Sequence, residues 1–325
     1  MIKQFNELAP EEIESLKKIT DKGLYQSYLW AELRNKSNEK PIIITYGSPI
    51  KGAMVLFEHS KSIPGLGKKK ILFSQGNPIG DNLNEILEEF KKESKKYFYG
   101  TIAPTAVNLK NEEFEKAGLY KISNWTILVD LNKTQEELWG AMEKKSARWG
   151  VKTAEKNNLV FELAKNQDIQ KFYELYSGTA TSGGFKAENI DFVKEFADSP
   201  LSKLFLVKKD DEVIAGGIIL IDYKNNYSIL DLTGASDKGL ELQAMPFLYW
   251  NLIKYSKSLN LNYFDLGGYD KEAKEGDKTY NINKFKERFG GNVSEQPIFS
   301  TNKKYLFLRN ILKKIKAIKP KTKHN

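Results

Sequence analysis

The stretch NYFDLGGYDKEAKEGDKTYNINKFKERFGGN, residues 262–292, contains the most informative residues of the chain. Its apolar beginning predicts a β-strand that ends in an acid and two glycines, Asp265-Leu266-Gly267-Gly268. Such residues at the point where a strand enters a loop are typical of binding sites, although a glycine pair alone more often marks a simple turn. We expect Asp265 either to order this loop or to accept a proton.

The end of the same stretch combines aromatic rings with cations. A long charged loop is predicted after the strand, and it is followed by Phe285-Lys286-Glu287-Arg288-Phe289 and two glycines. An isolated lysine here would usually be solvated. A cation held between aromatic side chains beside a glycine turn can instead meet a developing oxyanion or a phosphate. This segment therefore indicates a site that handles negative charge.

Outward from this stretch, short apolar runs alternate with amphipathic helical patterns along the whole chain. The alternation predicts a mixed α/β fold in which two similar units follow one another, because both halves repeat the same order of elements. We expect strands at residues 41–46, 53–58, 71–74, 97–102, 125–131, 159–164, 204–208, 212–223, 227–233 and 263–266, and helices at 9–18, 27–35, 83–96, 112–117, 134–157, 169–176, 190–197 and 241–259.

The composition is that of a folded globular protein. The 325 residues suit two domains, and 40% of them are hydrophobic while 29% are charged. The absence of cysteine excludes disulfides, thiolate metal sites and cysteine nucleophiles, and His59 and His324 are too few for a histidine metal site or a catalytic relay. We expect no metal. No signal peptide and no membrane-spanning run is recognisable, which predicts a cytoplasmic protein.

The net charge of +9 comes from the C-terminal tail. Lysine and arginine number 51 against 42 acids, and the nine cations after Glu295 are accompanied by no acid. Apolar residues recur between these cations at helical spacing, so the tail predicts an amphipathic basic helix. This helix can pack its apolar stripe on a domain with the basic face in water, or it can contact a phosphate-rich partner or the inner face of a membrane directly.

A series of short motifs runs in order along nearly the whole chain. They are Gln26-Ser27 with Trp30 and Arg34, residues 76–79 (GNPI), 126–131 (TILVDL), 137–156, 172–176 (FYELY), 214–216 (IAG) and 234–236 (GAS), then Trp250, residues 265–268 (DLGG) and Phe285-Lys286. Each is weak alone, but the ordered set resembles the Fem family, the non-ribosomal peptidyltransferases that move an amino acid from aminoacyl-tRNA onto a peptidoglycan precursor.

The resemblance implies two tandem acyltransferase domains of the GNAT type, without the coiled-coil arm that some relatives carry. The first domain is expected at residues 1–126, with the tail 298–325 packing back on it, and the second at 127–297. A GNAT enzyme that uses acetyl-CoA needs a glycine-rich pyrophosphate loop that opens a helix. Residues 237–243 lack such a loop. Acetyl-CoA is therefore not expected, and no other cofactor is implied.

The resemblance also implies roles for individual residues. Lys286 would face the oxyanion or the tRNA terminus, with Phe285 beside the ester. Arg34, near Trp30, would bind a phosphate or carboxylate of the acceptor bidentately. The substrate site would also contain Asp265, Gly267 and Gly268, and tRNA would be bound by Lys144, Arg148, Lys152, Arg288, Lys313 and Lys314. The implied partners of this monomer are aminoacyl-tRNA and a nucleotide- or lipid-linked precursor.

Cations recur at every fourth residue along the predicted helix 134–157, and two acids flank them. This spacing puts the cations on one slowly drifting stripe of the helix. A solvated face is the ordinary interpretation of such a stripe, and contact with tRNA phosphates is the alternative. The cations are Lys144, Arg148, Lys152 and Lys156.

Four positions depart from the family pattern: Arg34 stands where relatives carry a lysine, Thr233 or Asp231 stands where they carry an aromatic residue, and the other two are Ala103 and Ser182. Ala103 stands where relatives usually carry an aspartate before a proline, and Ser182 stands where they have an arginine shortly before Gly-Phe. These positions are implicated in holding the precursor, so another amine acceptor is one alternative. A non-catalytic protein that binds tRNA or an anionic surface on the same fold is the other.

Overall fold

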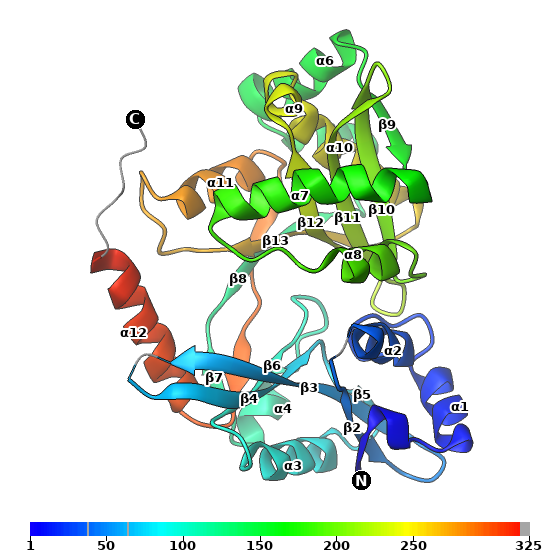
Figure 1. Cartoon of the computed structure of the whole chain (residues 1–325), viewed down its shortest axis with the longest axis vertical. Helices are drawn as coiled ribbons and strands as arrows, with labels where there is room; N and C mark the ends of the chain where they lie inside the picture. The colour runs from blue at the N-terminus through cyan, green and yellow to red at the C-terminus, as the bar shows by residue number, and fades with distance from the viewer. Residues whose placement is uncertain (38, 64, 319–325) are drawn as a thin grey trace. The chain divides into compact units, whose positions relative to one another are not determined.

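The computed structural model describes residues 1–37, 39–63 and 65–318, with the side chains of the last helix described up to Ile311. These residues form two compact units, each built around its own β-sheet (Figure 1). Unit 1 comprises Met1–Asp21, Tyr25–Ser123 and the described residues from Gln296 onward, and unit 2 comprises Lys22–Leu24 and Asn124–Glu295. The mixed α/β class predicted from the sequence is confirmed.

Unit 1 consists of one sheet and the helices around it. Its described strands run in the order β1-β2-β3-β4-β6-β15-β7, with β5 paired to β3. The strands are β1 (Ile2–Gln4), β2 (Ile42–Tyr46), β3 (Gly52–Ile63), β4 (Gly67–Gln75), β5 (Ile79–Gly80), β6 (Gly100–Ala103), β7 (Tyr120–Ile122) and β15 (Ile298–Ser300), and the helices are α1 (Pro10–Ile19), α2 (Tyr28–Lys36), α3 (Leu83–Ser94), α4 (Asn111–Lys116) and α12 (Lys304–Ile318).

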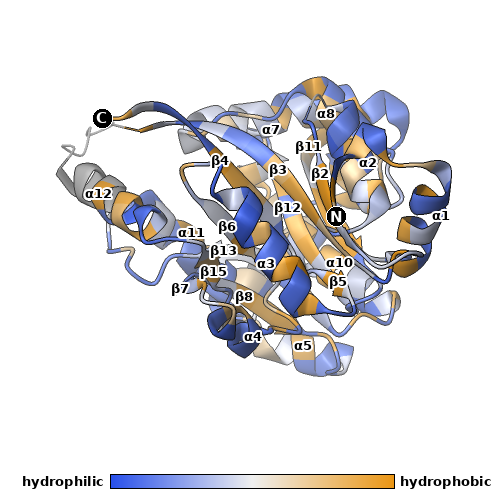
Figure 2. Ribbon diagram, turned by 90° about the horizontal axis from the view of Figure 1, so that it is seen from below, coloured by the Kyte–Doolittle hydropathy of each residue, from blue (hydrophilic) through white to orange (hydrophobic). Residues whose placement is uncertain are grey.

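The core of unit 1 forms between the sheet and α3. β2 and the first half of β3 are buried because their β-branched and aliphatic side chains fill a central sheet position. α3 contributes Ile86, Leu87 and Phe90 to the same cluster, at the spacing of one helix face. In Figure 2 hydrophobic residues follow β2 and β3, whereas much of α3 is hydrophilic.

Gln26 connects two strands of unit 1 at the point where they separate. The backbone pairing of β3 with β4 stops at Phe57 and Phe73, and beyond it the two strands are joined by side chains, with Ser74 Oγ donating to the Val55 carbonyl at 2.8 Å. The Gln26 amide nitrogen donates to Ser74 Oγ at 2.9 Å and its oxygen accepts from the Val55 amide at 2.7 Å. The Gln-Ser motif thus fills a gap in the sheet and, through Ser27 Oγ, caps α2.

The amphipathic helix expected in the tail is α12, and it packs on unit 1. The Tyr305 ring lies 5.2 Å from the Tyr99 ring, and Leu308 is buried in a cluster with Ile63 and Ile71. Arg309 Nη1 donates to the Ser123 carbonyl at 2.8 Å, which fixes the first turns of the helix.

Unit 2 is built on a second sheet whose described strands run in the order β14-β8-β13-β12-β11-β10-β9. Its strands are β8 (Trp125–Asp130), β9 (Val160–Leu163), β10 (Ser202–Lys209), β11 (Glu212–Asp222), β12 (Tyr227–Ala235), β13 (Tyr263–Tyr269) and β14 (Asn292–Glu295). Its helices are α5 (Gln135–Ala141), the π-helical turn η2 (Lys144–Arg148), α6 (Trp149–Lys156), α7 (Ile169–Gly183), α8 (Ile190–Ala197), α9 (Asp237–Glu241), α10 (Ala244–Ser258) and α11 (Lys278–Glu287).

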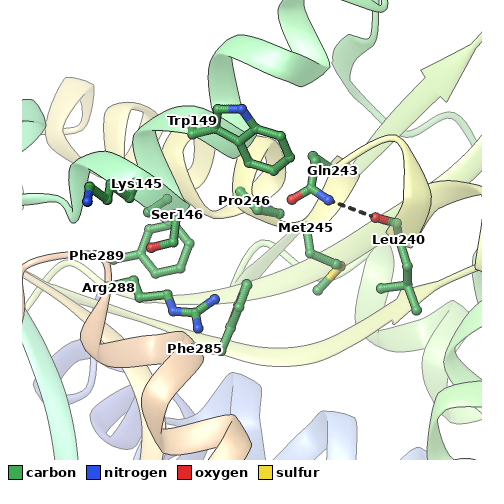
Figure 3. Close-up of a pocket in the computed structure, with 11 residues that line it drawn as sticks. Lys145, Ser146, Trp149, Leu240, Gln243, Met245, Pro246, Phe285, Arg288 and Phe289 are labelled. Atoms are coloured by element: carbon green, nitrogen blue, oxygen red, sulfur yellow. Dashed lines mark hydrogen bonds between the residues drawn. The ribbon is translucent and has the colours of Figure 1, made fainter.

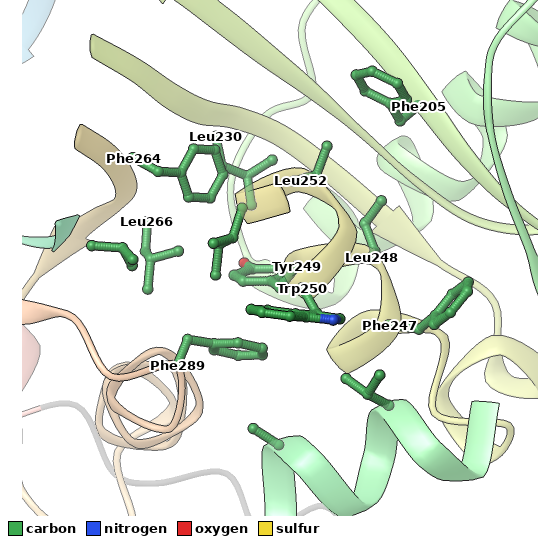
Figure 4. Close-up of a cluster of buried hydrophobic side chains, with 14 of the residues drawn as sticks. Phe205, Leu230, Phe247, Leu248, Tyr249, Trp250, Leu252, Phe264, Leu266 and Phe289 are labelled. Carbon is green, nitrogen blue, oxygen red and sulfur yellow. The ribbon is translucent and has the colours of Figure 1, made fainter. Parts of the chain in front are cut away.

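Helices cover both faces of the unit 2 sheet. On one face, Gly216 and Gly234 allow α7 to approach closely, and a Cβ at Gly234 would lie 2.4 Å from the Tyr176 amide nitrogen. On the other face, α10 buries Leu248, Trp250 and its neighbours against the strands (Figure 4). Because strand side chains alternate between faces, β11 is buried along almost its whole length.

Two expectations about unit 2 are wrong. The predicted helix 134–157 is broken into α5, η2 and α6, since Glu143 is extended and its amide donates to the Arg288 carbonyl at 2.8 Å. The predicted long loop after β13 contains α11, a polar helix with a weak apolar stripe. Its Asn283 is buried and bonds both backbone groups of Asp270, which ties the helix to the strand.

Among the described residues, no helix has the length and hydrophobicity needed to cross a bilayer.

Candidate active site

The candidate site forms where the parallel strands β12 and β13 of unit 2 separate. Their pairing ends at Ile229 and Asp265, although both strands continue for several residues. On the other edge of β13, two residues face one residue of β8, which is a β-bulge. Gly267 lies in this bulge with φ +81°, a conformation that favours glycine. The bulge frees backbone groups of β13 for other partners.

Asp265 is fully buried beneath the bulge. One carboxylate oxygen accepts hydrogen bonds from Thr126 Oγ1 and from the Gly267 amide at 2.7 Å, and the other accepts from the Tyr227 hydroxyl at 3.1 Å. Burial raises the pKa of Asp265, and these hydrogen bonds oppose the shift. Both oxygens of Asp265 are thus engaged by groups of β8, β12 and the bulge itself.

Lys286 reaches the bulge from the last turn of α11. Its Nζ donates to the Gly268 carbonyl at 2.9 Å and lies 3.4 Å from the Cβ position of Gly267. Burial lowers the pKa of Lys286 to about 8, while the nearby charge of Asp265 opposes the decrease. A lysine with such a pKa is a typical functional-site group, because it changes charge close to physiological pH.

A pocket of about 270 Å³ lies beside α11 within unit 2. Its lining is largely aromatic and apolar and includes two cations, of which Arg288 extends toward Phe285 while Lys145 points away from it (Figure 3). Trp149 is 54% exposed, so its ring is available for stacking. The side chains that define the pocket come from η2, α6, α10, α11 and the residue after α11, and they are Lys145, Trp149, Met245, Pro246, Phe285 and Arg288.

Phe285 is fixed by an aromatic cluster at the base of this pocket. Its ring meets Tyr249 edge to face at 5.1 Å, and it meets Phe289 at 5.3 Å. Such contacts limit ring motion and position the exposed side of Phe285. Because Lys286 is the next residue on the helix, one turn of α11 serves both the pocket and the bulge.

The cations predicted to contact tRNA are placed differently from one another. Arg288 lines the pocket and lies 3.5 Å from the Glu143 carboxylate, whereas Lys144 and Lys152 are exposed. Arg148 is half-buried at the end of η2, and the π-turn changes the predicted four-residue spacing. The slowly drifting stripe expected for these cations is therefore interrupted by the π-turn between Lys144 and Arg148. The side chains of Lys313 and Lys314 lie outside the described residues.

Arg34 and Trp30 belong to unit 1, where the arginine is already paired. Its guanidinium contacts the Glu39 carboxylate and lies 5.5 Å from the Trp30 ring. Burial alone would raise the pKa of Glu39, but the hydrogen bond from His59 and the charge of Arg34 outweigh it, so the pKa is lowered. An acceptor anion would have to compete with Glu39 for Arg34.

Sequence reasoning did not identify Trp149, Lys145 or Met245 as site residues. An exposed tryptophan within a charged helical segment was the available signal, because large apolar side chains are seldom left in water without a reason. Nothing in the sequence around Met245 distinguishes it from an ordinary core residue. Among the described residues, no group of three acidic or histidine side chains could hold a metal ion.

The chain thus consists of two α/β units in tandem, each with its own mixed sheet, and the candidate site lies in unit 2. A family model described as the FemAB family matches residues 87–208. A crystal structure of FemX matches with a TM-score of 0.70 at 16% identity, covering 93% of this chain and 97% of that chain. The predicted resemblance to the Fem family is confirmed.

Two further solved structures share this fold. The structure of L-PGS from Bacillus licheniformis has a TM-score of 0.62 at 15% identity and covers 94% of this chain and 95% of that one. The C-terminal domain of a putative lysylphosphatidylglycerol synthetase from Agrobacterium fabrum has a TM-score of 0.61 at 14% identity, with 90% and 93% coverage. No curated protein matches the sequence.

Proposed function

We propose that the protein is an aminoacyltransferase that moves an amino acid from aminoacyl-tRNA to an amine of a peptidoglycan precursor. The observation that carries this proposal is Lys286, a lysine of lowered pKa held at the β13 bulge beside an aromatic and basic pocket. The Fem-family resemblance supports a transferase.

The pocket suits the end of a charged tRNA. Nucleic-acid bases stack on exposed aromatic rings, and Trp149 and Phe285 offer two such surfaces. Phosphates are attracted by cations, which Lys145 and Arg288 of the pocket lining provide. This placement would bring the ester of the aminoacyl group to the turn of α11 that carries Lys286.

The reaction needs few groups from the protein because the ester is already activated. A neutral amine of the acceptor attacks the ester carbonyl, and the tetrahedral oxyanion forms within reach of the Lys286 ammonium. The bond from carbon to the tRNA hydroxyl oxygen then breaks, and the proton lost by the amine passes to that oxygen. No covalent enzyme intermediate is required, and alignment supplies much of the acceleration.

The lowered pKa of Lys286 predicts the pH profile of this reaction. Turnover should rise with pH as the acceptor amine becomes neutral, and it should fall above about 8 as Lys286 loses its charge. If Lys286 acted as a base instead, activity would continue to rise above that pH.

Transfer of radiolabelled amino acids from charged tRNA to nucleotide-linked and lipid-linked precursors tests the proposal. Lys286→Met should lower turnover by about 100- to 1000-fold with tRNA binding retained. The matched control is Lys284→Met, since Lys284 lies on the same helix but is exposed and pairs with Glu287 at 2.7 Å. Equal turnover in the two variants would refute a catalytic role for Lys286.

A second candidate function is a non-catalytic protein that binds tRNA or another polyanion. The observation that favours it is the ion pair of Arg34 with Glu39, which occupies the group predicted to hold the acceptor. Salt-sensitive tRNA binding without transfer to either precursor would support this candidate.

A further inference from the structure

The hairpin of β3 and β4 carries a cluster of lysines near its tip. Lys61 and Lys69 lie directly opposite one another in the antiparallel register. Like charges at opposed positions destabilise a strand pair. Within residues 1–37, 39–63 and 65–318, no ion pair is found for either lysine, whereas Lys70 pairs with Glu58 at 2.9 Å. The hairpin therefore maintains an uncompensated positive charge.

This charge lies on the face of the hairpin that adjoins α12. Side chains alternate along a strand, so Lys61 shares a face with Ile63, and Lys69 shares it with Ile71. Both isoleucines join Leu308 of α12 in one buried cluster. The basic face of the hairpin thus continues into the C-terminal helix, within unit 1.

Apolar side chains are also exposed on α12 and at the tip of the hairpin. Phe307 is 64% exposed and Leu306 is 39% exposed on α12, and Leu66 at the hairpin tip is 49% exposed. Lys304 and Arg309 lie on the helix, and Lys303 directly precedes it. Figure 2 shows hydrophobic stretches on α12 and a hydrophilic end of β4. We call Lys61, Leu66, Lys69 and the described residues 303–311 the hairpin–helix surface.

We propose that the hairpin–helix surface binds an anionic lipid bilayer. Lysines attract the lipid headgroups, and exposed leucine and phenylalanine side chains enter the boundary with the acyl chains. A nucleic acid would use the lysines but gives Leu66 and Leu306 nothing to bind, because aliphatic side chains do not stack on bases as rings do. The inference goes beyond the proposed reaction and stands independently of it.

Vesicle flotation of the full chain tests the electrostatic part. The protein should bind vesicles of phosphatidylcholine with phosphatidylglycerol and should bind phosphatidylcholine vesicles weakly. Lys61→Gln with Lys69→Gln should weaken binding about 30-fold, from about fivefold for each lysine. The matched control is Lys92→Gln with Lys116→Gln, which removes two exposed lysines elsewhere on unit 1. This control should leave binding within twofold of the unmodified protein.

Phe307→Ser tests the apolar part. It should weaken binding about tenfold, and the loss should persist at high salt, whereas the lysine effect should shrink as salt screens it. Phe185→Ser is the matched control because Phe185 is comparably exposed in unit 2. Melting temperatures establish that the variants fold. Substitution of Lys61 and Lys69 should not lower the melting temperature, because it relieves the repulsion between them.

Three results would overturn the proposal. They are equal binding to neutral and anionic vesicles, equal losses in the test and control variants, and a lysine variant that loses tRNA binding while it keeps vesicle binding. The last result would assign the surface to RNA.

Discussion

Units 1 and 2 each contain one parallel strand pair among their described strands, and the two pairs end differently. In unit 1, β4 and β6 stay paired from Leu72–Gly100 to Gln75–Ala103, where both strands end. In unit 2, β12 and β13 stop pairing at Ile229–Asp265 although both continue. The parallel strands of unit 1 thus stay paired to their ends, whereas those of unit 2 separate before theirs.

The difference shows how each unit satisfies the backbone groups of a separated strand. In unit 1 the strands that separate are β3 and β4, and the side-chain amide of Gln26 bonds to both of them. Unit 2 leaves the bulge of β13 to Asp265 and Lys286, two ionisable groups that are costly to bury. A neutral amide suits a structural junction, whereas ionisable groups at an open strand end suit chemistry.

The largest expected effect on stability concerns the packing beneath the open pair. Gly234→Ala should lower the free energy of unfolding by about 3 kcal/mol, because the added Cβ would meet the α7 backbone. Urea denaturation measures the loss. Gly178→Ala is the control on α7 itself, since no atom lies within 4 Å of its added Cβ, and it should be neutral or stabilising. A neutral Gly234→Ala would show that α7 does not need this close approach.

Asp265→Asn should cost about 2 kcal/mol, because one hydrogen-bond acceptor becomes a donor in a buried site. It should also move the alkaline limb of the pH profile to lower pH, since the charge of Asp265 raises the pKa of Lys286. Chemical denaturation and pH-dependent turnover measure the two effects, with exposed Asp198→Asn as control. An unchanged alkaline limb would show that the charge of Asp265 does not affect the pKa of Lys286.

Lys286→Met should stabilise the fold at pH 7 by about 1 kcal/mol, after allowance for solvent screening of a partly exposed group. The native pKa of about 8 is below the ordinary lysine value, so the unfolded chain binds more protons between these values. The unmodified protein therefore gains stability as pH rises from 8 to 10.5, and the advantage of the variant disappears. Thermal unfolding across this range measures it, and a constant difference would contradict the lowered pKa.

The smallest effect is expected in unit 1. Glu39→Gln should cost about 0.5 kcal/mol at pH 7, the range of a partly exposed ion pair. Because the pKa of Glu39 is lowered, this contribution is present above the ordinary carboxyl pKa and is lost as pH falls below about 4. Stability compared at pH 7 and pH 3 checks it. Tighter precursor binding by the variant would indicate that Glu39 masks Arg34.

The sequence predicts a helix or strand correctly where the pattern within that segment is enough to define it. The helix predicted at residues 190–197 is observed as α8 (Ile190–Ala197), because its apolar residues recur at helical spacing and Asn189 caps it. The break at Glu143 depends on the Arg288 carbonyl, and no pattern near Glu143 encodes that distant contact. α11 lacks a strong apolar stripe, so its helix is stabilised by contacts such as Tyr269 to Glu287.

The candidate site likewise contains some residues that the sequence predicts and others that it does not. The strand-end Asp265 and the Phe285-Lys286 pair are visible as motifs, and the structure brings all three to one turn of α11 and one bulge. The pocket beside them is assembled from several helices, so its outline could not be derived from spacing. Arg34 looked available in the sequence because the pairing with Glu39 requires the chain to turn after α2.

The π-turn η2 determines the direction in which the side chains of α6 point around the helix axis. In this turn the Arg148 amide bonds the Glu143 carbonyl, so the turn contains one residue more than an α-helical turn. Each added residue rotates a helix by about 100°, which is the rotation that presents Trp149 to the pocket. A chain shortened by one residue between 143 and 149 could keep every side chain of the pocket and still lose its stacking surface. The number of residues at this point is thus as important for the pocket as their identity.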